Sequence, residues 1–355
     1  MRHQLVGADL SARLMVHLNG NAQIVQPAAP DILKESQRMK GQPMAVVPSE
    51  CKVALLAGGT SGERDISINS GKGSMGALQE AGFDVTWIDP ANKEDLKRLV
   101  DEHFDVAFLC LHGKKGEDGT VQGMLELLGI PYTGSGVFAS AAAMDKGKAK
   151  ILYEHAGLPV IPGVALSIDD ERDIDAIREI VGIPCVVKPA TEGSSLGLRI
   201  VKDAAELEEA IDFVFTVDDD IIIEKFVAGT ETTVAIIGND NPEALPVIEI
   251  VPLAADTYDF ESKYAPGGCK HICPARLSEE ISDLLKEKGK EAHKAIGCRG
   301  VSRTDFIVDE DGNPWILETN TIPGMTATSL LPDTAGVAGY SFPELCTKLI
   351  EFALE

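Results

Sequence analysis

The chain lacks the features of membrane-spanning proteins and of general nucleic-acid binders. No apolar run approaches the roughly 18 to 20 residues that a membrane helix needs, and the amino terminus has no basic segment followed by an apolar core. Positive charge is scarce, with 32 Lys and Arg against 56 Asp and Glu, a formal net charge of -24. This balance disfavours binding to nucleic acid or anionic membranes, although it allows a local basic pocket for a phosphorylated ligand. We expect no membrane or nucleic-acid partner and a cytoplasmic location.

Cysteine is sparse, and its distribution argues against disulfides and against zinc. The seven cysteines are scattered along the chain: Cys51, Cys110, Cys185, Cys269, Cys273, Cys298 and Cys346. Their odd number and their apolar surroundings predict reduced thiols. His271 lies between Cys269 and Cys273, but no second cluster completes the four ligands of a structural zinc site. The sequence thus disfavours a metal there.

The remaining composition is that of an ordinary globular protein. Hydrophobic residues make up 44% and charged residues 25% of the 355 residues, with 34 Gly and 19 Pro, which excludes a wholly disordered or fibrous chain. At roughly 100 to 200 residues per domain, this length allows two or three domains. Residues 1–50 carry weak apolar patches, a Pro/Ala segment and a polar stretch. They predict a flexible or loosely helical arm; a translation start nearer Met39 or Met44 would also explain them.

Strand and helix patterns alternate from Lys52 onwards. The first part is predicted to form strands at 53–57, 85–88 and 106–111 and a helix running toward residue 80. This alternation implies a parallel sheet with helices on its faces, ending near the loop at 131–136. A small α+β domain follows, with helices at about 145–156 and 204–215 and strands at 185–188 and 198–201. The last part is predicted to hold a helix at 278–296 and strands at 221–225, 232–237, 245–250, 304–308 and 315–318.

These patterns divide the chain into four predicted parts. They are an arm at 1–50, an amino-terminal α/β domain at 51–136, a central domain at 137–223 and a carboxyl-terminal domain at 224–355.

Two segments resemble dinucleotide phosphate loops but lack the right context. Residues 71–76 match GxGxxG and residues 134–139 nearly do. That fingerprint must follow a strand directly and open a helix, whereas residues 71–76 lie inside a predicted helical stretch. No Walker A sequence is present either. An ATP site here therefore needs another design.

Residues 186–197 offer such a design. An apolar strand delivers Lys188, and a Gly/Ser loop follows that can lay backbone amides and hydroxyls over phosphates. Taken alone, the segment fits a surface loop with a solvated lysine equally well.

The carboxyl-terminal strands carry a group of oxygen donors. Arg303 and Asp305 lie on one predicted strand, and Glu318 and Asn320 end the next; alternation puts each pair on one face. Two carboxylates and an amide oxygen at adjacent strand ends suit Mg2+ that bridges nucleotide phosphates. The alternative is a cross-strand ion pair between Arg303 and an acid, which leaves Asn320 and the following Pro-Gly-Met loop unexplained.

Four long motifs make the chain from about Lys52 to its end similar to the D-alanine-D-alanine ligase family of the ATP-grasp superfamily. They are GGTSGERDIS at 58–67, LHG through EDGTVQG at 111–123, EGSSLG at 192–197 and ETNTIPGM at 318–325. The resemblance implies three α/β (α+β) domains, with a parallel sheet in the first and ATP bound between the central and carboxyl-terminal domains. Residues 1–50 lie outside it.

The resemblance also implies a reaction. In this family ATP phosphorylates the carboxylate of a first D-alanine, and the amine of a second attacks the acyl phosphate and releases phosphate. The residues implied to bind ATP are Lys146, Lys188, Glu192, Ser195, Glu224, Lys225, Phe226, Val227 and Glu231. Those implied to hold two Mg2+ or Mn2+ ions are Asp305, Glu318 and Asn320.

The implied substrate contacts come from four segments. Arg303 and the Gly324 amide would stabilise the tetrahedral oxyanion, Glu63 would pair with the first ammonium, and His112 would sit near the first carboxylate. The residues implied to receive the second carboxylate are Lys263, Ser329 and the Leu330 amide; Ser329 could equally be a helix cap. A link between Tyr264, Ser194 and Glu63 would close the loop at 258–274 over the site and exclude water.

Several alternatives remain open at this point. Lys263 and Tyr264 favour D-alanine over D-lactate as second substrate, whereas pockets reject the one additional hydroxyl of D-serine poorly. Another ATP-grasp carboxylate-amine ligase would lack Glu63 and this pair, and a non-catalytic nucleotide sensor would tolerate loss of a metal ligand. The family further implies a cytoplasmic homodimer that supplies D-alanyl-D-alanine for peptidoglycan.

Deleting residues 1–43 is expected to leave turnover intact, because every motif above begins after Lys52. Comparing the steady-state rate of the truncated and full chains checks this. A truncated protein that folds but has lost turnover would overturn the expectation.

Overall fold

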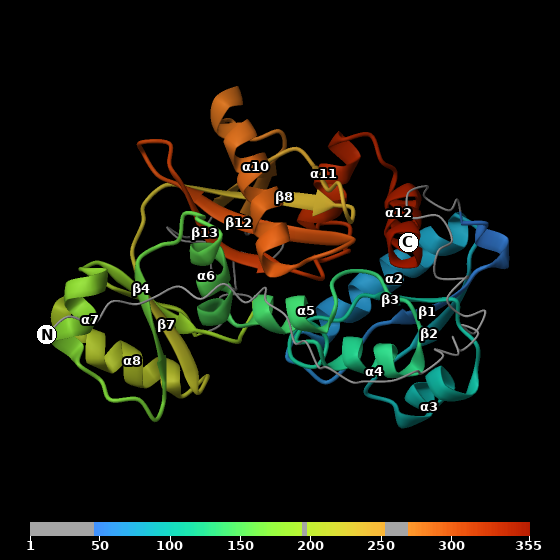
Figure 1. Ribbon diagram of the computed structural model, residues 1–355, viewed down its shortest axis with the longest axis horizontal. Coiled ribbons are helices and arrows are strands. Elements are labelled where there is room, and N and C mark those ends of the chain that lie inside the picture. Colours follow the sequence, from blue (N-terminus) through green and yellow to red (C-terminus); the bar gives the residue numbers. More distant parts are fainter. Residues whose placement is uncertain (1–45, 194–196, 253–268) are drawn as a thin grey trace, which may run out of the picture. The chain divides into compact units, whose positions relative to one another are not determined.

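The computed structural model describes residues 46–193, 197–252 and 269–355. They belong to one unit that spans Pro43–Glu355. Three β-sheets organise this unit (Figure 1). A short 3-10 turn, η1 (Pro48–Glu50), precedes the first strand.

The first sheet is parallel and has helices on both faces. Its strand order is β2 (Asp84–Ile88), β1 (Lys52–Leu56) and β3 (Val106–Leu109). Alternation along β1 puts Val53 and Leu55 into one core cluster and Ala54 and Leu56 into another. The first cluster includes α2 (Arg64–Glu80), and the second includes α3 (Lys93–Asp101) and α4 (Thr120–Leu128). The predicted parallel sheet with helices on its faces is confirmed.

The glycines at 71–76 lie inside α2, so the predicted helical position of this GxGxxG segment is confirmed. A Cβ on Gly71 would overlap the Ala57 Cβ and would lie 2.7 Å from the Trp87 ring. A glycine there lets the helix approach the end of β1 closely, which is a packing role.

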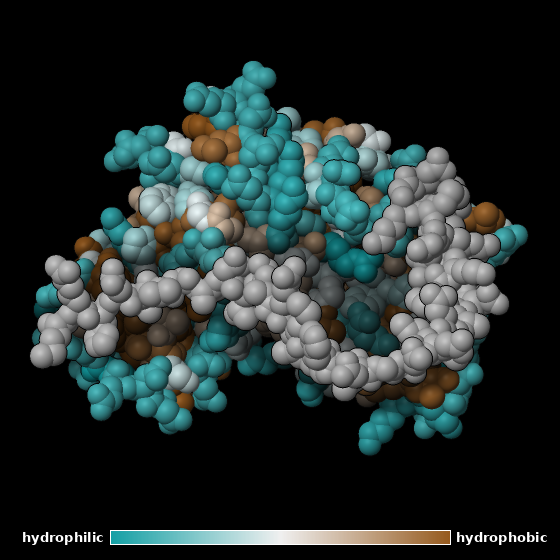
Figure 2. Space-filling model, in the orientation of Figure 1, coloured by the Kyte–Doolittle hydropathy of each residue, from teal (hydrophilic) through white to brown (hydrophobic). Residues whose placement is uncertain are grey.

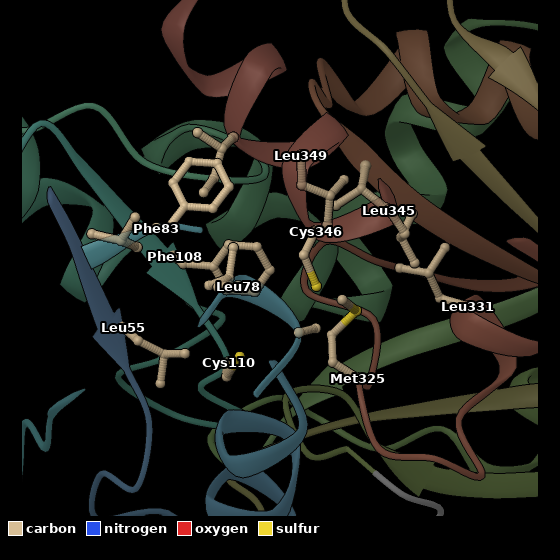
Figure 3. Packing of buried hydrophobic residues seen from close by; sticks show 14 of the residues in the cluster. Leu55, Leu78, Phe83, Phe108, Cys110, Met325, Leu331, Leu345, Cys346 and Leu349 are labelled. Carbon is tan, nitrogen blue, oxygen red and sulfur yellow. The ribbon is translucent and has the colours of Figure 1, made fainter. Parts of the chain in front are cut away.

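The last helix of the chain also packs on the parallel sheet. α12 (Phe342–Leu354) lies beside α2 (Figure 1). Figure 3 shows Cys346 and Leu349 of α12 in one cluster with Leu55, Leu78 and Phe108. Segments from opposite ends of the described chain thus share one hydrophobic core.

The second sheet is antiparallel and has helices on one face. Its order is β4 (Gly163–Ser167), β7 (Asp220–Lys225), β5 (Cys185–Pro189) and β6 (Arg199–Val201). The helices α7 (Ile174–Val181) and α8 (Leu207–Phe215) cover it (Figure 1), and a 3-10 turn η2 (Ala204–Glu206) precedes α8. The helices α5 (Val137–Met144) and α6 (Lys146–His155) come before this sheet. The predicted domain boundary at 223/224 falls inside β7.

The third sheet is antiparallel and carries the carboxyl-terminal motifs. Its order is β11 (Cys269–Ile272), β10 (Ile248–Pro252), β8 (Thr230–Ile237), β12 (Val301–Val308) and β13 (Pro314–Asn320), with β9 (Glu243–Ala244) paired to β8. The helix α10 (Glu279–Ile296) packs on β8 and β12, and its outer face is hydrophilic (Figure 2). The helix α11 (Leu330–Val337) contributes Leu330 to a cluster with Ile248 and Ile250.

Two expectations about this sheet are corrected. The strand predicted at 245–250 runs over Ile248–Pro252, because Pro246 has no amide hydrogen to donate to a ladder. The predicted lid at 258–274 includes Cys269–Ile272, which form β11 and pair with β10. The partner of β11 is β10, which the sequence of 269–272 alone does not reveal.

Buried His293 makes the stability of this sheet and its helix depend on pH. His293 on α10 is 1% exposed, and its Nδ1 lies 2.7 Å from Ser302 Oγ on β12. Burial, with the nearby Lys294 charge, lowers the pKa of His293 to about 4. An unfolded histidine titrates near 6.5, so between about pH 6.5 and 4 the unfolded chain binds a proton that the folded chain does not.

We therefore expect acid to destabilise the wild-type chain more than a His293→Gln variant. The extra loss in the free energy of unfolding should reach about 3 kcal/mol as pH falls from 6.5 to 4. Urea unfolding at pH 7, 5.5 and 4 measures it, with His103→Gln at an exposed histidine as the control. Parallel pH curves for wild type and His293→Gln would contradict the expectation.

Candidate functional site

A cavity of about 550 Å³ separates the second sheet from the third. Its size suits a nucleotide-sized ligand. On one side, Val186 and Lys188 point into it while Cys185 and Val187 face the helices, as strand alternation requires. Eight of the nine residues implied to bind ATP line it: Lys146, Lys188, Glu192, Glu224, Lys225, Phe226, Val227 and Glu231. Ser195 lies outside the described residues.

A buried carboxylate between two lysines supports the wall of this cavity. Glu224 is 2% exposed and contacts Lys150, and its Oε2 lies 2.6 Å from Lys188 Nζ. Burial raises the pKa of the Glu224 carboxyl, but Lys188 and Lys150 outweigh it and hold that pKa below its usual value. Lys150 also donates to the Ile161 carbonyl at 2.7 Å. Glu224 therefore stays ionised and fixes Lys188 at the cavity.

Lys146 connects the Gly/Ser loop to the third sheet. It opens α6, whose N-cap Asp145 accepts from the Lys148 amide. Lys146 Nζ donates to the Glu192 carbonyl at 2.8 Å and lies 3.1 Å from Glu318 Oε2 on β13. The Lys146 ammonium thus contacts both the start of the Gly/Ser loop, at Glu192, and the Glu318 carboxylate.

The oxygen donors of β12 and β13 come together as alternation predicts. In the strand register Asp305 faces Glu318 and Arg303 faces Asn320. Asp305 is 5% exposed, and both Asp305 and Glu318 line the cavity. Asn320 Nδ2 lies 3.5 Å from Asp305 Oδ2. The predicted placement of these residues on neighbouring strands is therefore confirmed, but Asp305 lies inside β12 and not at its end.

Cations and a hydroxyl hold these carboxylates in place. Arg303 Nε and Nη2 donate to the two oxygens of Asp305 at 2.9 and 2.8 Å, and Thr233 Oγ1 on β8 donates to Asp305 Oδ1 at 2.5 Å. Arg303 thus forms an ion pair with Asp305 within β12, which differs from the cross-strand pair considered from the sequence as an alternative. It coexists with a carboxylate pair at the cavity wall, and that oxygen-only donor set fits a hard divalent cation. Within the described ranges, no group of three or more His, Cys, Asp or Glu side chains forms a metal cluster.

Glu63 and His112 lie on neighbouring loops at the carboxyl ends of β1 and β3. Ser61 Oγ donates to the His112 carbonyl at 2.6 Å and ties these loops together. A Cβ on Gly193 would lie 3.1 Å from Glu63 Oε2, and one on Gly113 would lie 3.0 Å from it. The Glu63 carboxylate therefore reaches the Gly/Ser loop.

His112 is linked to the loop that follows β13. It is 8% exposed, and its Nε2 lies 3.3 Å from Ser70 Oγ on α2. Ser70 Oγ in turn accepts from the Met325 amide at 3.3 Å. On the other side, His112 Nδ1 lies 3.8 Å from Glu117 Oε1. The buried histidine thus connects the first sheet to the Pro-Gly-Met loop.

Gly324 and Ser329 face each other across this loop. A Cβ on Gly324 would lie 2.7 Å from Ser329 Oγ, so a larger residue there would require the Ser329 side chain to move. Ser329 occupies the N-cap position of α11 without a side-chain cap hydrogen bond; its Oγ accepts from the Thr326 amide at 3.0 Å. Leu330 begins the helix, where unpaired amides are available to an anion.

Some predicted site residues fall outside the described chain, and some supporting residues were missed. The former are Ser194, Ser195, Lys263 and Tyr264. The latter are Ser70, Lys150 and Thr233, whose roles arise from contacts with distant segments. Lys150 lies four residues after Lys146 on one helix face, which is the one local signal that sequence offers.

No helix within the described residues is long and apolar enough to cross a membrane. All seven cysteines lie within these residues, and none forms a disulfide.

Two family models match the chain. The model of the D-ala D-ala ligase C-terminus matches residues 152–351, and that of the D-ala D-ala ligase N-terminus matches residues 90–135. A D-alanine--D-alanine ligase of Syntrophobacter fumaroxidans is 50% identical over 307 residues, covering 85% of this chain and 97% of the relative. One of Halalkalibacterium halodurans is 48% identical, covering 86% of this chain and 99% of the relative.

Solved structures agree with these matches. A crystal structure of D-alanine--D-alanine ligase from Bacillus anthracis aligns with a TM-score of 0.76 at 35% identity, covering 86% of this chain and 97% of the other. A second structure of that enzyme, complexed with ATP, aligns with a TM-score of 0.75 at 33% identity. The fold is thus that of these ATP-grasp ligases.

Proposed function

This chain belongs to the D-alanine–D-alanine ligase family, and from that premise we propose that it joins two D-alanine molecules with ATP. ATP phosphorylates the carboxylate of the first D-alanine, and the amine of the second attacks the acyl phosphate and releases phosphate. The observation that carries this proposal is one cavity with Lys146, Lys188, Asp305 and Glu318 on its wall. Two cations and two carboxylates are the groups that phosphoryl transfer from a metal-bound nucleotide requires.

The proposed nucleotide position follows from the charges along the cavity. Lys146 and Lys188 bind the phosphates at the end near β12 and β13. Phe226 and Val227 line the adenine slot with Lys225, and Glu231 holds the ribose hydroxyls. Glu224 acts chiefly by holding Lys188, because both of its oxygens face lysines. Glu192 lies beside the Gly/Ser loop. Its backbone carbonyl accepts a hydrogen bond from Lys146 Nζ, which holds the loop next to Lys146.

Two Mg2+ or Mn2+ ions would be held by Asp305, Glu318 and Asn320, whose donors are all oxygens on neighbouring strands. When bound, these ions neutralise charge on the transferring phosphoryl group. Arg303 and Lys146 orient the two carboxylates beforehand through the contacts described above.

We place the acyl-transfer step beside the loop that contains Gly324, close to Glu63 and His112. Arg303 and the Gly324 amide donate to the tetrahedral oxyanion, Glu63 pairs with the first ammonium, and His112 faces the first carboxylate. The second carboxylate binds Ser329 and the Leu330 amide, with Lys263. Ser194 and Tyr264 are proposed, from the sequence resemblance, to close the site with Glu63.

The proposal also includes the biological setting that the family implies. The enzyme acts in the cytoplasm as a homodimer, and its D-alanyl-D-alanine enters peptidoglycan synthesis. The four predicted parts, with boundaries after residues 50, 136 and 223, remain our proposed domain division. Sedimentation of the full chain measures the oligomeric state.

Phosphate release from ATP and Mg2+ tests the reaction. The rate is measured with D-alanine, L-alanine, D-serine or D-lactate, and mass spectrometry identifies the products. We expect release that depends on D-alanine and a D-alanyl-D-alanine product, and none from a Lys188→Met variant. Mixed products with D-serine or D-lactate would favour the alternative ligase types. Folded protein that binds ATP but needs no D-amino acid would overturn the proposal.

A further inference from the structure

A cysteine, a histidine and an aspartate form a hydrogen-bonded chain between β11 and α11. Cys269 and His271 lie two residues apart on β11, so both side chains are on one face of the strand. Cys269 Sγ is 3.5 Å from His271 Nε2, and His271 Nδ1 is 2.9 Å from Asp333 Oδ2 in the first turn of α11. The ring is thus held between a thiol and a carboxylate.

This order of groups is the one that activates a thiol. The carboxylate of Asp333 accepts a hydrogen bond, which assigns the proton of neutral His271 to Nδ1 and leaves Nε2 to accept the thiol proton. The thiolate, and not the thiol, is the nucleophile. A nucleophile beside a base, with the base oriented by a third group, is the arrangement found in enzymes that use cysteine.

The chain of groups is also reachable from solvent. The side chain of His271 is 18% exposed and that of Asp333 38% exposed, and Cys269 is partly exposed. β11 ends the strand order of the third sheet within the described residues. A small reagent can therefore approach Sγ from the edge of the sheet.

Two other partly exposed cysteines provide comparison inside the same molecule. Burial raises the pKa of Cys273, and it raises that of Cys298 to about 12. Cys273 comes four residues after Cys269 and feels the same Asp333 charge, but no histidine lies at hydrogen-bonding distance of it among the contacts of the described chain. A difference in reactivity between Cys269 and Cys273 therefore reports on His271.

We propose that Cys269 is a modification site for small electrophiles, foremost peroxides, with His271 as its base and Asp333 as the positioning residue. The Cys269 sulfur attacks one peroxide oxygen, so that an S–O bond forms while the O–O bond breaks. Sulfur loses two electrons, and the peroxide gains them. The leaving hydroxide takes the proton that His271 removed from the thiol, and the products are a sulfenic acid and water.

The test measures the rate at each cysteine of the full chain. Brief treatment with iodoacetamide at pH 7, followed by digestion and mass spectrometry, gives separate rates for Cys269, Cys273 and Cys298. We expect Cys269 to react about tenfold faster than Cys273, because His271 can accept the proton of the Cys269 thiol, whereas burial raises the pKa of the Cys273 thiol. Equal rates at Cys269 and Cys273 in the wild-type protein would overturn the proposal without any variant.

Variants separate activation from exposure. His271→Asn should slow Cys269 several-fold and leave Cys273 unchanged. Asp333→Asn should also slow Cys269 several-fold but should speed Cys273, because the Asp333 charge raises the pKa of the Cys273 thiol. Asp333→Glu should recover part of the Cys269 rate. If His271 had only a structural role, its replacement would change the reaction rates of Cys269 and Cys273 in the same direction. Hydrogen peroxide followed by dimedone should label Cys269 in the wild type and not in His271→Asn. Unchanged Cys269 labelling in His271→Asn would overturn the proposal, and these readouts do not depend on ligase activity.

Discussion

Replacing Arg303 by lysine should lower kcat by about 100- to 1000-fold, the loss typical of one oxyanion donor. The guanidinium uses Nε and Nη2 to grip both oxygens of Asp305. A lysine ammonium has the same charge but not this planar fork, so it cannot hold Asp305 and an oxyanion together. The affinity for ATP should change much less, because Arg303 is not among the residues that line the nucleotide cavity.

Steady-state phosphate release gives kcat, and titration with ATP gives its dissociation constant. Arg299→Lys is the matched control, since that guanidinium donates to the Phe352 carbonyl at the surface. The control should keep wild-type kcat. An Arg303→Lys variant within threefold of the wild type would remove Arg303 from the proposed chemistry.

Replacing Glu224 by glutamine should destabilise the fold by about 3 to 5 kcal/mol. The change removes the carboxylate between two lysines, of which Lys150 is buried and Lys188 has a side chain only 11% exposed. Their mutual repulsion and lost solvation are then uncompensated. The Lys150→Met/Glu224→Gln double variant should recover part of the loss, because one unpaired cation is gone.

Urea unfolding measures these differences, with Glu249→Gln as the comparison. Glu249 is also nearly buried, but its partner Arg276 is 64% exposed, so water can solvate the unpaired guanidinium. We expect a loss there of about 1 kcal/mol or less. Equal losses at Glu224 and Glu249 would show that the burial of the lysines is unimportant.

The strands and the carboxylate pair could be derived from local pattern. Each strand side chain alternates between two faces, so Asp305 and Glu318 had to lie near one another once their strands paired. The apolar runs at β1 and β3 alternate with helical patterns, and this alternation predicts a parallel sheet. The assignment of Lys146 and Phe226 to one cavity came from motif resemblance, because they are far apart in sequence.

The missed contacts depend on tertiary packing that local pattern does not encode. Ser70 reads as an ordinary helix serine, yet it bridges His112 and Met325, which is 255 residues away. Thr233 acts on Asp305 only because β8 pairs with β12. β11 pairs with β10 across a long connection, and the only local signal for Lys150 is its spacing from Lys146. Such roles can be assigned only from the tertiary structure.

The packing of α12 on the parallel sheet has a consequence for synthesis in the cell. The strands of that sheet are synthesised before α12, whose Cys346 and Leu349 complete one face of their core. Domains usually fold from the amino terminus as translation proceeds. Here the strands carry exposed apolar surface until α12 has been synthesised, so during translation that surface must be protected by chaperones or by rapid completion of α12.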